Sequence, residues 1–289
     1  MSSFQFKTLA IPARDGFPLS ARTYSVPGPI PGRGVVIIHA ATAVPQKIYA
    51  PFANYLRDNG FIVITYDYRG IADSKDLLTP INKFPVTMLD WAQLDADGVH
   101  DWVQTQYPDL PISVVGHSFG GQGLGLLENA KHIRKVVMVA SQNGYWRYFN
   151  PKNQPFMFFN WYVLFPLFLF FMNYIPMRKL GQGEDLPGGV AQQWRNWCVH
   201  PDYLFSELNE TQKQAYKNFP APILSFGFSD DAFAGGNSME KLIERYPSSA
   251  TLKKLAPQDL GVKKIGHFGF FKPKFRETLW AEARDWLRA

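Results

Sequence analysis

The 289-residue sequence predicts an α/β fold in which a mostly parallel, eight-stranded sheet is covered by helices on both faces. Short apolar runs alternate with stretches of helical spacing, and this alternation is typical of βαβ units. The composition, with 46% hydrophobic and 19% charged residues, argues against both a disordered chain and a coiled coil. The length suits one large domain, or one domain with an insertion.

The order of the predicted elements follows the apolar pattern along the chain. Residues 4–11 and 19–25 alternate between apolar and polar side chains around a turn at Asp15-Gly16, which predicts an antiparallel hairpin at the sheet edge. Short apolar runs predict six more strands at 35–38, 61–66, 112–115, 136–140, 223–227 and 251–255. Helical spacing predicts helices at 48–59, 88–107, 121–130, 239–246 and 275–288.

The pattern is interrupted between residues 144 and 219, which divides the chain into a core of residues 1–143 and 220–289 and one insertion. Fourteen aromatic residues lie between Tyr145 and Tyr174. Because ligands bind at the carboxyl edge of such sheets, we expect the insertion to form a helical cap whose aromatic side chains help to line an apolar pocket. The apolar run Trp161–Met172 is shorter than the about 20 residues that cross a bilayer, so we expect no stable membrane insertion.

The charge of the chain limits the kinds of partner that we expect. The net charge is +6, and residues 251–276 alone carry seven basic residues and one acidic residue. This segment is either a solvated surface or a patch for an anionic substrate or a membrane surface, so peripheral membrane contact stays open. The sequence lacks nucleic-acid-binding motifs, which argues against nucleic acid as a partner.

The single cysteine, Cys198, excludes an internal disulfide and a cysteine-ligated metal site. The first ten residues lack the pattern of a secretory signal, so we expect a cytoplasmic protein. The oligomeric state stays open.

The sharpest motif is Gly116-His117-Ser118-Phe119-Gly120-Gly121. It directly follows the predicted strand 112–115 and opens a predicted helix, which is the strand–turn–helix context of a nucleophile elbow. In such a turn the glycines at 116 and 120 let neighbouring backbone pass, and the Ser118 hydroxyl is held above the sheet. A phosphate-binding loop is the alternative, but the lysine of that motif is missing.

A serine nucleophile requires a base, and in this fold the chain order is serine, acid, histidine. His267 is the histidine that lies in a loop between the last predicted strand and the closing helix. The other five occupy elements or loops that do not suit a base: His39, His100, His117, His132 and His200. We therefore expect His267 to be the base.

The acid and the oxyanion donors follow from the same geometry. Asp230 and Asp231 both follow the strand 223–227, and we prefer Asp230, the third residue after Gly227, with Asp231 as the alternative. The backbone N–H of Phe119, the residue after the nucleophile, is one expected oxyanion donor. The second should come from the loop after residue 38, where we expect Ala41, with Ala40 as the alternative.

These motifs together resemble the α/β-hydrolase superfamily, and the resemblance covers essentially the whole chain outside the insertion. It rests on His39-Ala40, the Gly116–Gly121 elbow, the segments around Asp230 and His267, and a loop at residues 67–74 that is similar to the superfamily's Asp-x-Arg-Gly-x-Gly-x-Ser loop. Two positions depart from the pattern, since Ala40 and Ala72 stand where glycine is usual.

Within the superfamily, the chain looks like bacterial predicted hydrolases related to serine aminopeptidases and monoacylglycerol-lipase-like enzymes. This resemblance implies a cofactor-free serine hydrolase with a cap after the sixth strand. We expect Ser118, His267 and Asp230 to hydrolyse a small-molecule acyl ester with an apolar part. The alternatives are an acyltransferase on the same triad, a serine peptidase or amidase, and, ranked last, a non-catalytic protein that binds a lipophilic ligand.

Overall fold

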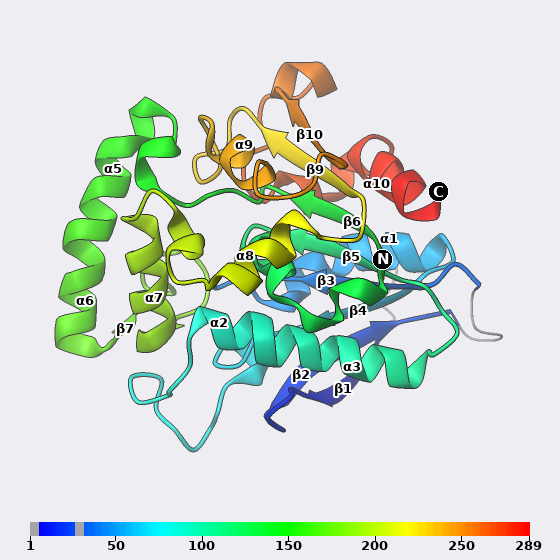
Figure 1. Ribbon diagram of the computed structural model, residues 1–289, viewed down its shortest axis with the longest axis horizontal. Helices are drawn as coiled ribbons and strands as arrows, with labels where there is room; N and C mark the ends of the chain where they lie inside the picture. Colours follow the sequence, from blue (N-terminus) through cyan, green and yellow to red (C-terminus); the bar gives the residue numbers. More distant parts are fainter. Residues whose placement is uncertain (1–5, 27–31) are drawn as a thin grey trace.

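The computed structural model describes residues 6–26 and 32–289 and contains one eight-stranded sheet (Figure 1). The strands in spatial order are β1 (Lys7–Pro12), β2 (Pro18–Tyr24), β4 (Ile62–Tyr66), β3 (Val35–His39), β5 (Ile112–His117), β6 (Ile133–Val139), β9 (Ile223–Phe228) and β10 (Ala250–Leu255). β2 pairs antiparallel with β1 and β4, and all other pairings are parallel. The predicted α/β fold is therefore confirmed. Phe4 and Gln5 of the predicted hairpin lie outside the described residues.

Helices cover both faces of this sheet. α1 (Ala50–Asp58) and α10 (Leu279–Arg288) pack together through Trp280, whose ring centroid lies 5.3 Å from that of Phe52 and 5.4 Å from that of Tyr55. α2 (Met88–Asp90), η3 (Trp91–Ala96) and α3 (Asp97–Gln106) form one continuous helix in front of the sheet in Figure 1. Every residue of β3, β4, β5 and β9 is buried, which explains why these strands are apolar without alternation.

Short helical turns connect these elements. The 3-10 helices of the core are η1 (Gln46–Tyr49), η2 (Ala72–Ser74), η4 (Gly123–Leu126), η5 (Glu128–His132), η10 (Pro257–Leu260), η11 (Gly269–Phe271) and η12 (Pro273–Phe275). α9 (Ser238–Ile243) lies before β10. Closing helix α10 begins four residues later than predicted, because η12 occupies residues 273–275.

The helix predicted at 121–130 is much shorter in the structure. α4 spans Phe119–Gln122, and the chain then continues as η4 and η5. Glycines at positions 121, 123 and 125 weaken an α-helix here. The Tyr216 hydroxyl donates to the carbonyl of Gln122 at 2.7 Å, so a tyrosine takes the place of the next helical turn.

The segment between β6 and β9, residues 144–219, is called here the inserted segment. It contains η6 (Trp146–Tyr148), η7 (Pro151–Asn153), α5 (Gln154–Phe159), η8 (Asn160–Leu164), α6 (Phe165–Met172), β7 (Tyr174–Ile175), β8 (Leu186–Pro187), α7 (Gly188–Cys198), η9 (Tyr203–Ser206) and α8 (Glu210–Lys217). β7 and β8 pair as a separate two-stranded sheet. Figure 1 shows α5, α6 and α7 gathered at one end of the molecule, beside the large sheet.

One helix of the inserted segment is longer than the sequence pattern indicated. Residues 151–172, which comprise η7, α5, η8 and α6, form a helix of 22 residues that is long and apolar enough to cross a membrane by length and composition. The twelve-residue apolar run Trp161–Met172 therefore underestimates the length of this helix. The π-helical turn η8 directly precedes the start of α6, where Pro166 is accommodated within the first turn.

Candidate active site

Ser118 occupies a strained turn between β5 and α4. Its backbone angles are φ 51° and ψ −115°, a conformation that costs a non-glycine residue roughly 1–3 kcal/mol. A Cβ added to Gly116 would lie 2.6 Å from the carbonyl oxygen of Gly120, and one added to Gly120 would clash with the carbonyl of His39. The turn is therefore closed to larger residues at both glycines, as the motif predicted.

Ser118 and His267 line the same cavity, which has a volume of about 640 Å³. The inserted segment contributes mostly apolar and aromatic walls: Phe149, Phe156, Met157, Trp161, Phe165, Met177 and Trp194. The core contributes Thr42, Val44, Phe268 and Phe271 beside the two polar side chains. This size and lining are typical of a pocket for a small, largely apolar molecule.

The His267 ring is held by Asp231. Nδ1 of His267 donates to Oδ2 of Asp231 at 2.8 Å, and the Asp231 side chain is fully buried. The other carboxylate oxygen, Oδ1, accepts the backbone N–H groups of Phe233 at 2.7 Å and Ala234 at 3.1 Å. Because Nδ1 carries the proton that this contact requires, Nε2 of His267 is the nitrogen left to exchange protons.

Among the described residues, no hydrogen bond joins the Ser118 hydroxyl to His267. In unliganded active sites such bonds are often long and tighten when substrate binds.

The preferred acid, Asp230, does not contact the His267 ring, whereas Asp231, the alternative, does. The Asp230 carboxylate instead accepts the backbone N–H groups of Ile265 at 2.9 Å and Gly266 at 3.0 Å. The reason lies in strand length: β9 extends through Phe228, and the turn that follows is closed by the Asp231 N–H on the Phe228 carbonyl. The turn therefore directs the second aspartate, not the first, toward the ring.

A buried chain of hydrogen bonds connects three loops of the site. Nε2 of His117 lies 3.0 Å from the carbonyl oxygen of His267, and a carbonyl accepts only, so His117 is protonated at Nε2. Burial lowers the pKa of His117 well below its ordinary value, so the ring is neutral and its Nδ1 is an acceptor. The Tyr49 hydroxyl donates to this Nδ1 at 2.9 Å and accepts the Ala41 N–H at 2.9 Å. Sequence patterns gave no sign of this chain.

This series of buried hydrogen bonds also affects which backbone N–H groups are free to act as oxyanion donors. The Ala41 N–H is already donated to Tyr49, so the structure does not support Ala41 as a free donor. Ala40 is buried and is absent from the cavity lining, whereas Thr42 lines the cavity. The Thr42 N–H has no partner within residues 6–26 and 32–289. Phe119 begins α4, where the first N–H groups have no partner inside the helix, as expected for a donor.

The loop after β3 is braced by the inserted segment. The Glu184 N–H donates to the carbonyl of Ala43 at 2.8 Å, and Ala43 has a φ of 63°. A Cβ added to Gly183 would also collide with the Ala43 backbone, a contact of 2.5 Å to the carbonyl oxygen. The conformation of this loop therefore depends on residues 183–184.

Two other histidines form a separate buried pair below the site. Nδ1 of His39 lies 2.6 Å from the Tyr66 hydroxyl, and its Nε2 lies 3.2 Å from Nε2 of His100. Burial lowers the pKa of His39 well below its ordinary value and that of His100 to about 3. These rings are neutral parts of the core. Of the described His, Cys, Asp and Glu residues, no group of three or more is arranged to hold a metal ion.

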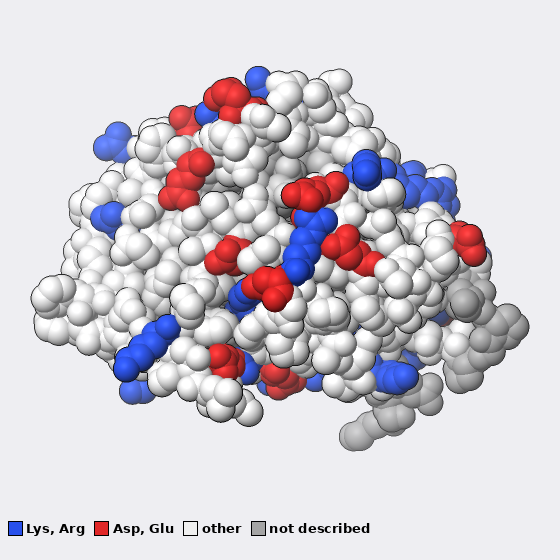
Figure 2. All heavy atoms as spheres, turned by 60° about the horizontal axis from the view of Figure 1, so that its bottom comes forward, with Lys and Arg blue, Asp and Glu red and all other residues white. Residues whose placement is uncertain are grey.

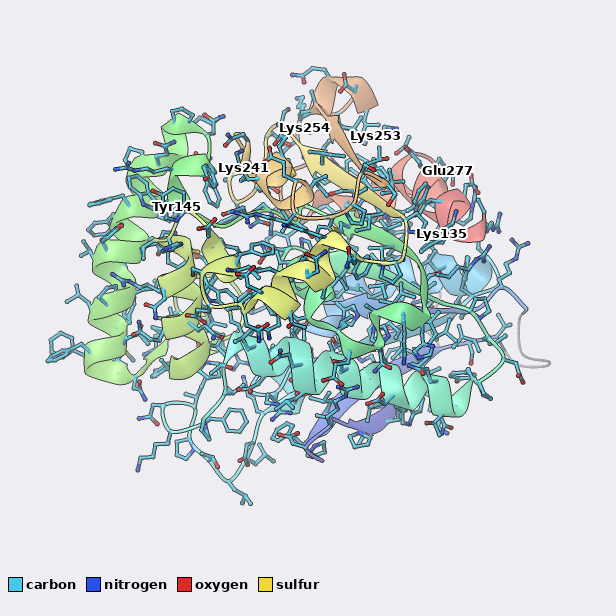
Figure 3. The ribbon with its side chains drawn as sticks, viewed as in Figure 1. Lys135, Tyr145, Lys241, Lys253, Lys254 and Glu277 are labelled. Carbon is cyan, nitrogen blue, oxygen red and sulfur yellow. The ribbon has the colours of Figure 1, made fainter. Side chains whose placement is uncertain are left out.

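Three of the seven basic residues of segment 251–276 form ion pairs with acidic residues, and the third of these, Arg276, lies 3.8 Å from Glu277. Lys253 binds Glu282 at 2.7 Å and Lys254 binds Glu240 at 2.7 Å. Figure 3 shows both lysines near β10 at the top of the view, away from α6 at the left. Lys272 is the member of this segment that lines the cavity.

Comparisons with known proteins identify the family and support the fold. The family described as "Alpha/beta hydrolase family" matches residues 35–275. No curated protein matches the chain by sequence.

Similar solved structures include an α/β serine hydrolase without a lid from Xanthomonas campestris, with 16% identity, a TM-score of 0.57, and coverage of 100% of this chain and 98% of that chain. A monoacylglycerol lipase from Paleococcus ferrophilus has 15% identity and a TM-score of 0.61, with coverage of 93% and 98%. An esterase from Exiguobacterium antarcticum has 14% identity and a TM-score of 0.62, with coverage of 98% and 100%. At these identities the likeness extends to the fold.

Proposed function

The chain belongs to the alpha/beta hydrolase family, and from this premise we propose that it is a serine hydrolase that cleaves carboxylic esters. The observation that carries the proposal is one cavity lined both by a serine at a strained turn and by a histidine whose Nδ1 is bound to a buried aspartate. These are the parts of an acyl-transfer site.

The proposed reaction begins when Ser118 Oγ attacks the ester carbonyl carbon while Nε2 of His267 removes the hydroxyl proton. The carbonyl oxygen becomes an oxyanion, for which the backbone N–H groups of Phe119 and Thr42 are the proposed donors. The bond to the alcohol then breaks, and His267 returns the proton to the leaving oxygen. Asp231 keeps the imidazole oriented and stabilises its charged form.

Water completes the reaction. It attacks the acyl carbon, and His267 takes one of its protons and passes it to Ser118 as the acyl–serine bond breaks. The carboxylic acid leaves and the enzyme is restored. Each step uses groups of the chain, substrate and water.

The inserted segment is the proposed cap of this site, and its lining sets the substrate class. Phe149, Met157, Trp161 and Phe165 supply apolar walls, and the one charged lining residue among those described is Lys272. An ester with an apolar acyl or alcohol part of modest size fits a lining of this kind.

The proposal is tested with a panel of acyl esters of increasing chain length, with amides beside them. Wild-type protein should hydrolyse esters, and Ser118→Ala should lower kcat by a factor on the order of 10⁶. A fluorophosphonate probe should label Ser118 in the wild type. Full ester hydrolysis by Ser118→Ala would show that the proposal is wrong.

Asp231→Asn and Asp230→Asn form a matched pair for the acid. Asp231→Asn should lower kcat by a factor on the order of 10⁴, because the histidine loses its orienting carboxylate. Asp230→Asn should act mainly on stability, since one backbone N–H of the base loop loses its acceptor, at a cost of about 1–3 kcal/mol. Equal losses of kcat in the two variants would contradict the assignment of Asp231.

A further inference from the structure

The helix of residues 151–172 exposes an apolar face that none of the residues described by the structure covers. Only 17% of the most apolar 18-residue stretch of this helix is buried. Lys152 is the one charged residue among residues 151–172. Large apolar side chains at intervals of helical spacing lie on the outside. Their exposed fractions are 49% for Phe156, 48% for Phe159, 49% for Leu167, 82% for Phe170 and 75% for Phe171.

The inner side of the same helix is fixed to the protein. The ring of Trp161 lies 4.9 Å from that of Trp194 on α7, and Phe165 lies 5.8 Å from the same ring. Nε of Arg195 donates to the Trp161 carbonyl at 3.0 Å. One side of the helix is therefore packed against α7 and the opposite side faces solvent. A helix held in this way cannot cross a bilayer as a separate span.

A second exposed apolar segment, distant in sequence, lies in a loop that contacts the end of this helix. Leu77 and Leu78 are 95% and 94% exposed in the loop after η2. Asn173, directly after α6, donates through its side-chain amide to the carbonyl of Asn82 in that loop. Figure 1 shows the loop beside the end of α6 where Phe170 and Phe171 lie. The exposed residues of α5 and α6 together with Leu77 and Leu78 are called here the apolar face.

Basic residues outnumber acidic ones along the helical part of the apolar face, although Asp76 precedes Leu77 and Arg178 forms an ion pair with Glu184. Residues 144–180 contain four basic residues, Arg147, Lys152, Arg178 and Lys179, and no acidic residue. Figure 2 shows the outermost left end of the molecule, where α5 and α6 lie, as white with single blue side chains, whereas red and blue alternate over the middle of the view.

We propose that the apolar face docks on the surface of an anionic lipid bilayer. Phenylalanine and leucine side chains on one side of a helix insert at the boundary of headgroups and acyl chains, and neighbouring lysine and arginine residues attract anionic headgroups. A protein partner is the weaker candidate, because protein interfaces carry a polar rim and about one hydrogen bond per 100–200 Å², and these exposed side chains offer no hydrogen-bonding groups.

Docking places the cavity beside the lipid. Phe156 belongs to the apolar face and also lines the cavity. Met157 and Trp161 of the same helix line the cavity as well, but they are buried. A molecule dissolved in the bilayer would thus have an entrance at the docked face. Docking does not require ester hydrolysis, so a vesicle-binding experiment tests it independently of the proposed function.

Co-sedimentation of the full chain with vesicles tests the proposal. Vesicles of phosphatidylcholine with phosphatidylglycerol should bind the protein, and binding should weaken with added salt and with pure phosphatidylcholine. The double variants Phe170→Ser/Phe171→Ser and Leu77→Ser/Leu78→Ser should each bind at least about tenfold more weakly. Thermal melting of each variant confirms that it is folded.

Two controls separate docking from other effects. Phe6→Ser removes a phenylalanine of 38% exposure next to β1, away from the apolar face, and should bind as wild type. Ser118→Ala should also bind as wild type. Absence of binding to either vesicle, or unchanged binding by both double variants, would overturn the proposal. A lipid-free dimer that Phe170→Ser/Phe171→Ser dissociates would overturn it in favour of a second copy of the chain.

Discussion

Beside two of the proposed catalytic residues, the adjacent residue in the chain holds a loop of the site in place. His117 precedes Ser118 and bonds the carbonyl of His267 at 3.0 Å. Asp230 precedes Asp231 and accepts two N–H groups from the loop that carries His267. The nucleophile and the base loop are therefore fixed to each other through their neighbours.

Tyr49→Phe tests the buried chain that joins these loops. The change removes the hydroxyl, which leaves the Ala41 N–H and His117 Nδ1 without their partner at a cost of about 1–3 kcal/mol in the free energy of unfolding. Misplacement of the loop after β3 should lower kcat by about tenfold to a hundredfold, with a smaller change in KM because Tyr49 does not line the cavity. Ester kinetics and urea unfolding measure the two effects.

Tyr55→Phe is the matched control, because the Tyr55 hydroxyl bonds Arg284 at 2.9 Å, away from the cavity. It should leave kcat unchanged. If Tyr49→Phe lost stability but kept the wild-type kcat, the chain would be structural and have no part in positioning.

At this scale the sequence predicted the residues whose motifs are local. Ser118 follows from its glycines, and His267 follows from its place before the closing helix. The apolar pattern does not distinguish Asp231 from Asp230, because the residue at which β9 ends is not visible in that pattern. The partner of Ala41 was missed because Tyr49 is brought to it by tertiary packing.

The elements near the nucleophile are shaped by contacts across the fold. Glycine-rich residues 119–126 do not sustain a regular helix, and tyrosines take over its hydrogen bonds: Tyr216 bonds the Gln122 carbonyl at 2.7 Å and Tyr246 bonds the Gly121 carbonyl at 3.2 Å. Spacing alone predicted a ten-residue helix here, because periodicity does not report which carbonyls receive side-chain donors.

Gly125→Ala tests this packing. A Cβ at position 125 would lie 2.5 Å from the ring of Tyr216, so the ring must shift, and overpacking of this kind costs about 1–3 kcal/mol. Urea unfolding should show the loss. Gly123→Ala is the control within the same short helix, since its Cβ would approach Ala92 at 3.3 Å, and its cost should be smaller. Equal costs would show that the Tyr216 contact does not govern this region.

For the whole molecule, buried histidines dominate the expected response to acid. Burial holds the pKa of His39, His100 and His117 below the ordinary value, so the folded protein keeps them neutral. Below about pH 6.5 the unfolded chain binds these protons and the folded chain does not. Asp67, Asp95 and Asp97 act in the opposite direction, because burial raises the pKa of Asp97 and raises those of Asp67 and Asp95 to about 6 and about 7.

The free energy of unfolding should therefore fall as the pH drops from 6 to 5. The three histidines, each nearly fully protonated in the unfolded chain at this pH, outweigh the carboxylates, so the net slope is positive and at most about 1.4 kcal/mol per pH unit. Urea unfolding at a series of pH values measures it.

His100→Gln should reduce that slope by about one proton, whereas His132→Gln at an exposed site is the control. A free energy of unfolding that stays constant or rises between pH 6 and 5 would contradict the prediction.

The contact of Glu184 and Gly183 with Ala43 limits how this protein can be trimmed or recombined. Excising residues 144–219 would remove the contacts that residues 183–184 make with the turn after β3, so the proposed active site would lose the support of this turn together with the cavity walls from the inserted segment. A chimaera that exchanges the inserted segment with that of another protein should therefore take residues 40–44 from the same protein as the segment.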